Sequence, residues 1–374
     1  MMKSSSAFVV ASSLLFSLTS AQSSATSKRG IAYIKGGESA DYNILLTSKS
    51  PMDWYYTWTP RTAPGDIFWG SKVDNDTIEF VPTIHNNTKL DDDIEALKDA
   101  PSASKYLFVF NEPDGTFETG GCDLTPQDAA RDYIAKIVPL RNRWKISHPV
   151  TTGSPRGFQW LQDFNAACWA IDPKNGCPTD FVTVHWYGDF IGMTSWIGQL
   201  AAWYNGSDAG LQGDLRVWVT EIGAPSAPMD ANYNVMSQTL PYLDSLEYVD
   251  RYAWFGAWRI GGANRNEWTG DGLSLFDDNG GLTTLGALYV GGETNGFAIG
   301  EKGKAYTAPT NNGSSGNDTN SEGGADNSTD TGSNNSTGNS TGSGQGGSGN
   351  GAQTNTAATW IFWTGLVAAG LWML

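Results

Sequence analysis

Two glutamates, Glu112 and Glu221, each stand at the end of a short apolar run of strand length. The run 106–110 and Asn111 precede Glu112, and the run 215–220 precedes Glu221. Cleavage of a glycosidic bond needs two carboxyl groups, one to protonate the leaving oxygen and one to attack the sugar or activate water. The pair therefore indicates sugar-cleaving chemistry.

A single glutamate after a strand is a weak signal, because many strand exits carry a polar residue that only caps the following turn. The chain around Glu112 strengthens the functional interpretation. Asn111 precedes it and Pro113 follows it, so the backbone must turn sharply and direct the side chain away from the strand end. We therefore take Glu112 and Glu221 as the candidate catalytic pair.

Aromatic residues gather at the ends of similar apolar runs. Sugar rings present flat patches of C–H groups that pack on aromatic faces, so these residues suit a glucan chain. The alternative is that many of them pack between strands and helices, and that the histidine is a structural hydrogen-bonding group. The candidate substrate-binding residues are Asn111, His185, Trp186, Tyr187, Trp254, Trp258 and Trp58.

Several other chemistries are disfavoured by the sequence. It has no His-Glu-X-X-His motif, paired cysteines or acidic cluster of metal-binding spacing, and we expect no metal and no cofactor. A Gly-X-Ser-X-Gly elbow and a phosphate-binding loop are also missing, which disfavours serine hydrolase and nucleotide chemistry. The net charge of −16 argues against nucleic acid and anionic lipid, which need a basic surface. A neutral polymer is the favoured partner.

Residues 30–300 have the length of one α/β barrel, and in them apolar runs of strand length alternate with longer helical periods. One helix is predicted to open at Thr125, which can cap it, with Pro126 in its first turn. The expected strands are 30–34, 54–58, 80–84, 106–110, 150–153, 181–185, 217–220 and 251–255, and further helices are expected near 90–98, 158–166, 196–204 and 233–246. The expected fold is α/β, a (β/α)8 TIM barrel whose C-terminal strand ends meet at one site.

Four motifs resemble fungal glycoside hydrolase family 128, the group that includes the alkali-sensitive linkage proteins of fungal walls. They are Asn111-Glu112-Pro113-Asp114, Asp180-Phe181 through His185-Trp186-Tyr187, Thr220-Glu221-Ile222-Gly223 and Tyr252-Ala253-Trp254-Phe255. The resemblance covers nearly all of 30–291. It implies a (β/α)8 barrel that acts on β-1,3-glucan with retention of configuration, with Glu112 as acid/base and Glu221 as nucleophile.

In these roles Glu112 brings a proton to the glycosidic oxygen, and Glu221 attacks the anomeric carbon as a carboxylate. Retention predicts carboxyl groups about 5 Å apart, and Asn111 would bind the hydroxyl next to the reacting carbon. Either Tyr187 or His185 is expected to orient Glu221. We expect an endo-β-1,3-glucanase, although loops that close one end of the groove would make it exo-acting. Two alternatives stay open: a glucan-binding wall protein without activity, and a transglycosylase.

Both ends of the chain differ from the barrel in composition. Residues 1–21 have the basic start, apolar stretch and small final residues of a secretory signal peptide. Residues 22–29 are a short propeptide or linker that ends in the dibasic pair Lys28-Arg29, a candidate processing site. Residues 301–350 consist largely of Gly, Ser, Thr and Asn and predict a disordered, glycosylated stalk.

The last residues, 351–374, combine a polar spacer with a short apolar tail, as in a GPI-attachment signal that is removed on maturation. Asn350 is the expected attachment residue. The mature protein is then expected to be a monomer on the outer face of the plasma membrane or in the cell wall, with the GPI anchor as its only contact with the membrane.

Three cysteines in a secreted chain allow one disulfide. Cys168 and Cys177 flank a polar loop and are the first choice among the three possible pairs, which leaves Cys122 as a thiol. Candidate N-glycosylation sequons within the barrel begin at Asn75, Asn86 and Asn205.

Overall fold

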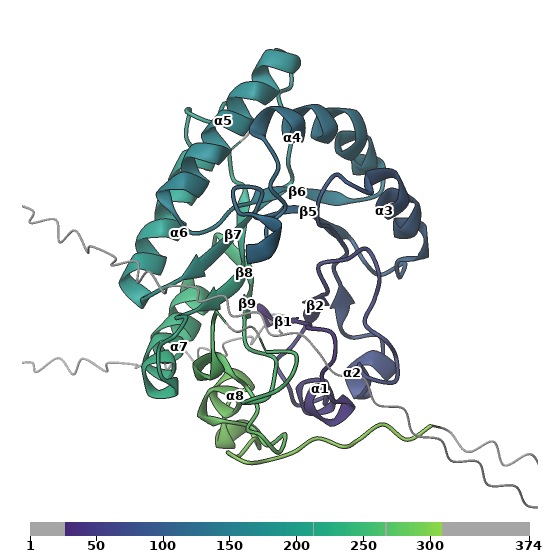
Figure 1. Ribbon diagram of the computed structural model, residues 1–374, viewed down its shortest axis with the longest axis vertical. Coiled ribbons are helices and arrows are strands. Elements are labelled where there is room, and N and C mark those ends of the chain that lie inside the picture. Colours follow the sequence, from purple (N-terminus) through teal and green to yellow (C-terminus); the bar gives the residue numbers. More distant parts are fainter. Residues whose placement is uncertain (1–26, 212, 266–267, 309–374) are drawn as a thin grey trace, which may run out of the picture. The chain divides into compact units, whose positions relative to one another are not determined.

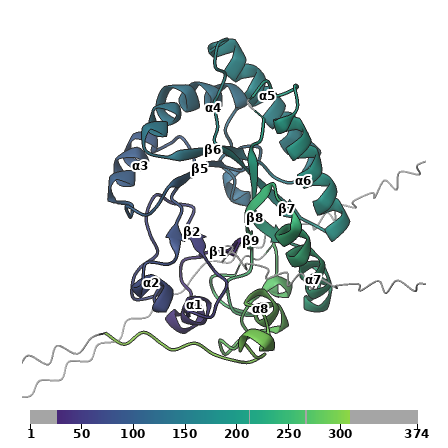
Figure 2. The same cartoon turned by 180° about the vertical axis from the view of Figure 1, so that it is seen from behind.

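The computed structural model describes residues 27–211, 213–265 and 268–308. The chain divides into two units, Met1–Thr310 and Asn311–Leu374, and all described residues belong to the first. In that unit the strands lie at the centre and the helices surround them, as Figure 1 shows from one side and Figure 2 from behind. The expected (β/α)8 barrel is confirmed. The expected signal peptide, GPI signal and most of the stalk lie outside the described residues.

Within the described residues, nine parallel strands follow the order β3-β2-β1-β9-β8-β7-β6-β5-β4. The two outer strands, β3 and β4, are pieces of one segment separated by Val81 and Pro82, so the chain itself closes the barrel. Proline has no N–H for the sheet, but the Pro82 carbonyl still accepts from the Phe108 N–H at 3.0 Å. The strands are β1 Arg29–Ala32, β2 Trp54–Tyr56, β3 Glu79–Phe80, β4 Thr83–Ile84, β5 Tyr106–Asn111, β6 Lys145–Val150, β7 Phe181–Tyr187, β8 Arg216–Gly223 and β9 Val249–Trp254.

Seven of the eight predicted strands coincide with observed ones, but the strand predicted at 150–153 is misplaced, since it shares only Val150 with β6. The strand there is β6, which ends where the predicted one begins. Because β6 contains polar residues, a search for apolar runs does not find it. Inside the barrel these polar groups are hydrogen-bonded, as the Ser147 hydroxyl is, which accepts from the Val109 N–H at 3.1 Å. Pro149 adds a second misleading signal, and the register with β5 shifts beside it.

Five of the eight described α-helices were predicted from the sequence, namely α3, α4, α5, α6 and α7. Thr125 caps α4 as expected, since its hydroxyl accepts from the Asp128 N–H at 3.1 Å. The sequence patterns miss α1, α2 and α8, which have four to seven residues and show no clear helical period in the sequence. The helices are α1 Ser39–Leu45, α2 Ser71–Asp74, α3 Leu90–Ala96, α4 Pro126–Asp132, α5 Pro155–Ile171, α6 Phe190–Asn205, α7 Met229–Ser245 and α8 Thr284–Tyr289. None of these described helices has the length and apolarity needed to cross a membrane.

The three barrel sequons begin at different kinds of position. Asn75 follows α2, Asn86 follows β4, and Asn205 is the last residue of α6. The Asn205 amide exchanges two hydrogen bonds with the backbone of Leu215, at 2.6 and 3.2 Å. At Asn86 the side-chain oxygen accepts from the N–H and the hydroxyl of Thr88. Glycosylation of the three asparagines stays a prediction.

The dibasic pair Lys28 and Arg29 is part of the barrel. The Lys28 ammonium donates to three main-chain carbonyl oxygens around the C-terminus of α7, at 2.8, 3.0 and 3.1 Å. A cation is favoured there because the helix dipole places negative charge at that end. Arg29 begins β1 and donates to the Tyr252 hydroxyl and the Tyr289 carbonyl. The structure therefore gives both basic residues a role in the fold, within a segment that the sequence assigned to a propeptide or linker.

We expect Lys28→Ala to lower the free energy of unfolding by about 1–2 kcal/mol, because the end of α7 loses its charged hydrogen-bond donor. Denaturant unfolding measures the difference. Lys174→Ala is the matched control, since Lys174 is exposed and such surface changes usually stay within about 0.5 kcal/mol. Equal effects of the two substitutions would contradict a capping role for Lys28.

The described fold also continues past residue 300. The Leu282 N–H donates to the Glu301 carbonyl at 2.9 Å. The backbone N–H groups of Lys304 and Tyr306 then donate to side chains of α1, to Asn43 and Ser39 respectively, at 2.9 Å each. The first residues of the segment predicted as a stalk are therefore hydrogen-bonded to the barrel.

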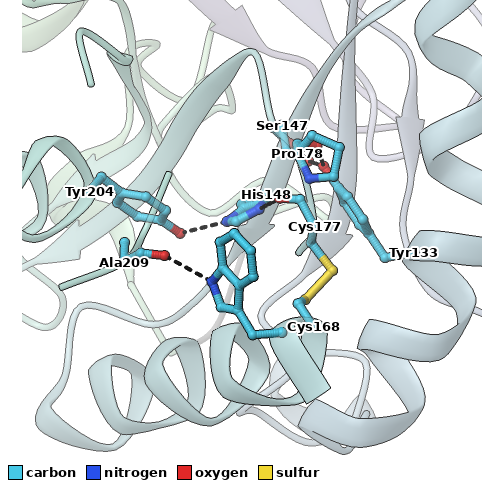
Figure 3. The surroundings of a disulfide bond; sticks show 9 residues. Tyr133, Ser147, His148, Cys168, Cys177, Pro178, Tyr204 and Ala209 are labelled. Carbon is cyan, nitrogen blue, oxygen red and sulfur yellow. Dashed lines mark hydrogen bonds between the residues drawn. A yellow bond between two sulfur atoms is a disulfide. The ribbon is translucent and has the colours of Figure 1, made fainter. Parts of the chain in front are cut away.

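A disulfide joins Cys168 of α5 to Cys177, while Cys122 is buried as a free cysteine. His148 of β6 lies beside this bond (Figure 3). Its Nε2 is 2.7 Å from the Cys177 carbonyl, so Nε2 carries the hydrogen, and Nδ1 accepts from the Tyr204 hydroxyl at 3.3 Å. Burial lowers the pKa of His148 to about 4. The neutral imidazole thus connects β6 to the disulfide loop.

We expect the free energy of unfolding to fall between pH 6.5 and pH 4, because the unfolded imidazole takes up a proton that the buried one does not. The native pKa of about 4, against 6.5 in the unfolded chain, corresponds to at most about 3 kcal/mol. This stability is complete above pH 6.5 and lost as pH falls to about 4. His148→Gln keeps a donor for the Cys177 carbonyl and should flatten this part of the profile in denaturant titrations. An unchanged slope in the variant would contradict the assignment.

Candidate active site

Glu112 and Glu221 meet at the C-terminal end of the barrel. Glu112 directly follows β5, whereas Glu221 lies within β8, which runs three residues further than the predicted strand. His185 of β7 is paired in register with Glu221. The three side chains are nearly removed from solvent, with exposures of 9% for Glu112, 5% for Glu221 and 1% for His185. Sequence-distant residues thus converge where a parallel barrel places its active site.

The three side chains form what we call the Glu–His–Glu cluster, Glu112, His185 and Glu221. One oxygen from each glutamate and one nitrogen of the imidazole lie within 4.8 Å of one another. The His185 Nδ1 is 2.8 Å from Oε1 of Glu112, and its Nε2 is 3.5 Å from Oε1 of Glu221. The imidazole therefore bridges the carboxylates, and a proton can reside on either partner of its short contact with Glu112.

Two further donors bind the Glu221 carboxylate. The Trp58 indole N–H donates to Oε1 at 2.9 Å, and the Tyr187 hydroxyl donates to Oε2 at 2.5 Å. An indole N–H can only donate, so Oε1 must accept. Both bonds favour the ionised carboxylate and fix its orientation. Trp58, predicted to bind substrate, thus also contacts the nucleophile candidate.

Opposing effects set the protonation of the cluster. Burial raises the pKa of Glu221, and the charge of Glu112 adds to this, while the charge of His185 and the two donors act against it. Burial lowers the pKa of His185, but the charge of Glu221 and the hydrogen bond with Glu112 outweigh burial and raise it overall. His185 therefore keeps its proton to higher pH than an isolated imidazole would, because its pKa is raised.

The backbone at Glu112 has an uncommon conformation. Phe110 and Glu112 have φ angles of 52° and 43°, in the left-handed region that non-glycine residues avoid. The Glu112 N–H donates to the Val150 carbonyl at 2.7 Å, and the Glu112 carbonyl accepts from the Cys122 N–H at 3.2 Å. A Cβ atom at Gly121 would lie 2.5 Å from that carbonyl oxygen, so only glycine fits there. These contacts hold the strained turn that aims the Glu112 side chain.

Asn111 and His85 hold the loop after Glu112. The Asn111 amide donates to the Gly120 carbonyl at 3.2 Å. His85 hydrogen-bonds to the backbone of Gly121, and burial lowers the pKa of this histidine. The contact of Asn111 with a sugar hydroxyl stays a prediction, whereas its contact with the loop is observed.

Three tryptophans that the sequence predicts to bind substrate do not lie at the cluster, and their contact with a sugar stays a prediction. Trp186 follows His185 in β7 and so points to the other face of the strand, where its indole donates to the Asp189 carbonyl at 2.8 Å. Trp254 and Trp258 are only 2% and 1% exposed. The indole of Trp254 donates to a main-chain carbonyl at 3.0 Å. Aromatic content alone did not distinguish core positions from site positions.

Two aromatic residues near Glu221 were missed. The Phe255 ring lies 5.9 Å from the Trp58 ring and 5.8 Å from the Tyr187 ring. Trp268 lies 5.0 Å from Tyr187. Phe255 could have been found, because it ends the predicted strand 251–255 and strand ends face the site. Trp268 sits in a long loop without any periodic signal.

The Glu–His–Glu cluster also meets the simplest geometric condition for a metal site, the only group of the described residues to do so. Sequence spacing could not reveal it, since its members come from three strands. However, Nδ1 of His185 already bonds Glu112, and both oxygens of Glu221 accept from Trp58 and Tyr187. A metal would have to displace these bonds, so the donor set fits proton transfer and covalent chemistry better.

We expect Tyr187→Phe to shift the acidic limb of the kcat/KM profile to higher pH by about one unit or more. That limb reports ionisation of the nucleophile in the free enzyme. Removing the Tyr187 hydroxyl removes a bond that lowers the pKa of Glu221, and a bond to a charged group contributes about 1.5–3 kcal/mol. Tyr204→Phe is the matched control, because the Tyr204 hydroxyl contacts His148 instead. A limb that stays in place would contradict the proposed contact.

A family model described as the glycosyl hydrolase catalytic core matches residues 30–289. The chain is 28% identical over 279 residues to alkali-sensitive linkage protein 1 of Schizosaccharomyces pombe, a match that covers 72% of this chain and 45% of that protein. The chain thus spans less than half the length of this curated relative.

Among solved structures, the chain resembles a family GH128, subgroup III, curdlan-specific exo-β-1,3-glucanase from Blastomyces gilchristii in complex with glucose. The identity is 26% and the TM-score 0.53, over 71% of this chain and 99% of that one. It also resembles a subgroup II endo-β-1,3-glucanase from Sorangium cellulosum, with 23% identity and a TM-score of 0.54, over 71% and 98% of the two chains. At 23% identity, the likeness to the Sorangium cellulosum enzyme supports the assignment of the fold alone.

Proposed function

Because the chain belongs to the glycosyl hydrolase catalytic core family, and within it to glycoside hydrolase family 128, we propose that it is a β-1,3-glucanase. The observation that carries this proposal is the Glu–His–Glu cluster at the C-terminal end of the barrel. Both solved relatives described above are β-1,3-glucanases, one exo-acting and one endo-acting. The enzyme class is thus an O-glycosyl hydrolase, and β-1,3-glucan is the proposed substrate.

The proposed mechanism retains the configuration at the anomeric carbon. Inversion needs carboxyl groups about 6.5–9.5 Å apart, to leave room for a water, whereas retention needs about 5–5.5 Å. An oxygen of Glu112 lies within 4.8 Å of an oxygen of Glu221, which supports retention. Glu221 is the proposed nucleophile, because two donors, Trp58 and Tyr187, favour its ionised form and fix its orientation.

The first step forms a covalent glycosyl-enzyme. An oxygen of Glu221 bonds to the anomeric carbon, the bond from that carbon to the glycosidic oxygen breaks, and Glu112 transfers its proton to that oxygen. In the second step a water gives a proton to Glu112 and its oxygen displaces Glu221 from the anomeric carbon. His185, 2.8 Å from Glu112, is the proposed positioning residue that orients the Glu112 carboxyl group in both steps.

The location of the protein is proposed on sequence grounds. We infer that a signal peptide, 1–21, directs secretion and that Asn350 receives a GPI anchor, so that a monomer acts in remodelling of the cell wall glucan. Release of the protein from intact cells by a GPI-specific phospholipase tests the anchor. Protein that stays in the cell pellet after this treatment would contradict it.

The proposed function is tested by incubating the purified protein with linear β-1,3-glucan and with its reduced oligosaccharides, and following products by size. Internal cleavage yields mixed shorter oligosaccharides, and exo action yields one small product from the start. Glu221→Gln should abolish both. Wild-type protein that leaves β-1,3-glucan intact would overturn the proposal.

Two alternatives give distinct results in the same experiment. Products longer than the starting oligosaccharide would identify a transglycosylase, in which a second glucan takes the place of water. Binding of glucan by wild type and Glu221→Gln alike, without any product, would identify a glucan-binding protein.

A further inference from the structure

Trp268 is an exposed aromatic residue next to the catalytic cluster. It is 60% exposed, which is unusual for so large an apolar side chain. Its ring centroid lies 5.0 Å from that of Tyr187 in an edge-to-face contact of 76°. Tyr187 in turn donates its hydroxyl to Glu221. One aromatic ring therefore separates the Trp268 indole from the side chain of the proposed nucleophile.

The backbone of Trp268 is anchored to the chain that leaves the nucleophile strand. The Ser226 hydroxyl donates to the Trp268 carbonyl at 3.3 Å, and the Ser226 N–H donates to the Thr269 carbonyl at 3.1 Å. Ser226 follows β8, the strand that carries Glu221, and Thr269 is fully buried. The backbone that carries the indole is therefore held by hydrogen bonds, even though most of the side chain is exposed. A fixed aromatic face loses little entropy when a ligand packs on it.

Exposed large apolar side chains also occur in other segments at this end of the barrel. Phe117 follows β5, Ile191 is the second residue of α6 after β7, and Tyr233 lies near the start of α7 after β8. Trp268 differs from these in its ring contact with a residue that bonds Glu221. Its exposed face is thus placed to meet a part of the substrate that extends beyond the cluster.

We propose that the exposed face of Trp268 binds a glucosyl unit of the polymer next to the unit that reacts at Glu221. This inference rests on the proposed function, since a β-linked glucan presents a second ring there. β-Glucose carries axial C–H groups on its ring faces, and these pack on an indole, whose N–H end tolerates the surrounding hydroxyls. Trp268 is therefore a specificity residue that favours longer glucans over short ones.

The test compares wild type with Trp268→Ala on reduced β-1,3-gluco-oligosaccharides of increasing length. We expect the loss in kcat/KM to be small for oligosaccharides too short to place a ring on the indole, and to reach about 10- to 100-fold once that ring is present, the range of about 1–3 kcal/mol for one stacked ring. Trp268→Phe should recover much of the loss. Tyr306→Ala, at an exposed aromatic residue held near α1, is the matched control and should leave the series unchanged.

Two results would overturn the proposal. A loss of equal size at all lengths, with a shifted acidic limb of the pH profile, would mean that Trp268 only supports Tyr187. An unchanged length series would mean that no sugar contacts the indole.

The outcome stays distinct from that of the proposed function. If wild type does not cleave β-1,3-glucan, the proposed function fails, and calorimetric titration of the oligosaccharides into Glu221→Gln, with and without Trp268→Ala, still tests the stacking. Equal affinities of these two proteins, including undetectable binding by both, would overturn it.

Discussion

Glu221→Gln is expected to lower kcat/KM on β-1,3-glucan by roughly 10⁴- to 10⁶-fold, the range found when an enzyme loses its nucleophile. Glutamine has nearly the same shape and can still accept from the Trp58 indole, so the barrel and the bound glucan should be retained. What the variant lacks is the negative charge and the oxygen that bonds to the anomeric carbon. The measurement is the initial rate of reducing-end release, with circular dichroism to confirm the fold.

The stereochemistry of a rescued reaction identifies the role. In Glu221→Ala a small anion such as azide can occupy the vacated space and attack from the same face, so an activated β-glucoside should give the α-glucosyl azide. Rescue without inversion, or an unrescued variant that retains near wild-type rates, would be incompatible with Glu221 as nucleophile. His148→Ala provides a control for substitution of a buried residue outside the site.

The fold was predictable because a (β/α)8 barrel repeats the same pattern of strand and helix along the sequence. Eight apolar runs in alternation with helical periods predicted seven of the eight strand positions. The length of residues 30–300 indicated that the strands close into one barrel. The failure at 150–153 has a local cause. β6 carries Ser147 and Pro149, whose sequence signals are those of a loop, and only the structure provides the partners that make them acceptable in a strand.

The two glutamates were predictable for a similar reason, since each ends or interrupts an apolar run at the end of the barrel that carries function. Their connection through His185 was not, because no local pattern reveals that residues from β5, β7 and β8 lie within hydrogen-bonding distance. Trp58 was expected at a sugar ring, but the structure places its indole N–H on Glu221, beside the Tyr187 hydroxyl.

The positions of the aromatic residues could not be predicted from the sequence, for one physical reason. Trp and Tyr serve equally well in a core and at a sugar, and in a barrel the direction of the side chain decides which. In β7 this alternation separates His185 from Trp186. Trp254 and Trp258 are buried in the core. Trp268 could not be assigned from sequence because its exposure and its contact with Tyr187 depend on the loop conformation.

Glu112→Gln is expected to affect substrates according to their leaving groups. Cleavage of β-1,3-glucan should fall by roughly 10²- to 10⁴-fold, the usual contribution of a general acid, because a sugar alkoxide cannot leave without a proton. A β-glucoside with a dinitrophenolate leaving group needs no such proton, so its first step should be nearly unchanged. The second step still lacks a base, so a rapid burst of phenolate followed by slow turnover is the expected time course.

The same variant tests the part played by His185. Glutamine at 112 can still bond Nδ1 of His185 but cannot give up a proton, so the alkaline limb of the first step should disappear while the acidic limb, which belongs to Glu221, stays in place. Azide needs no base and should restore turnover with the β-glucosyl azide as product, the opposite anomer to that from Glu221→Ala. Losses of equal size on both substrates, or the α-azide from the Glu112 variant, would instead assign the nucleophile to Glu112. The two carboxylates are close to each other and share one histidine, so only this difference in leaving-group dependence and product anomer separates their roles.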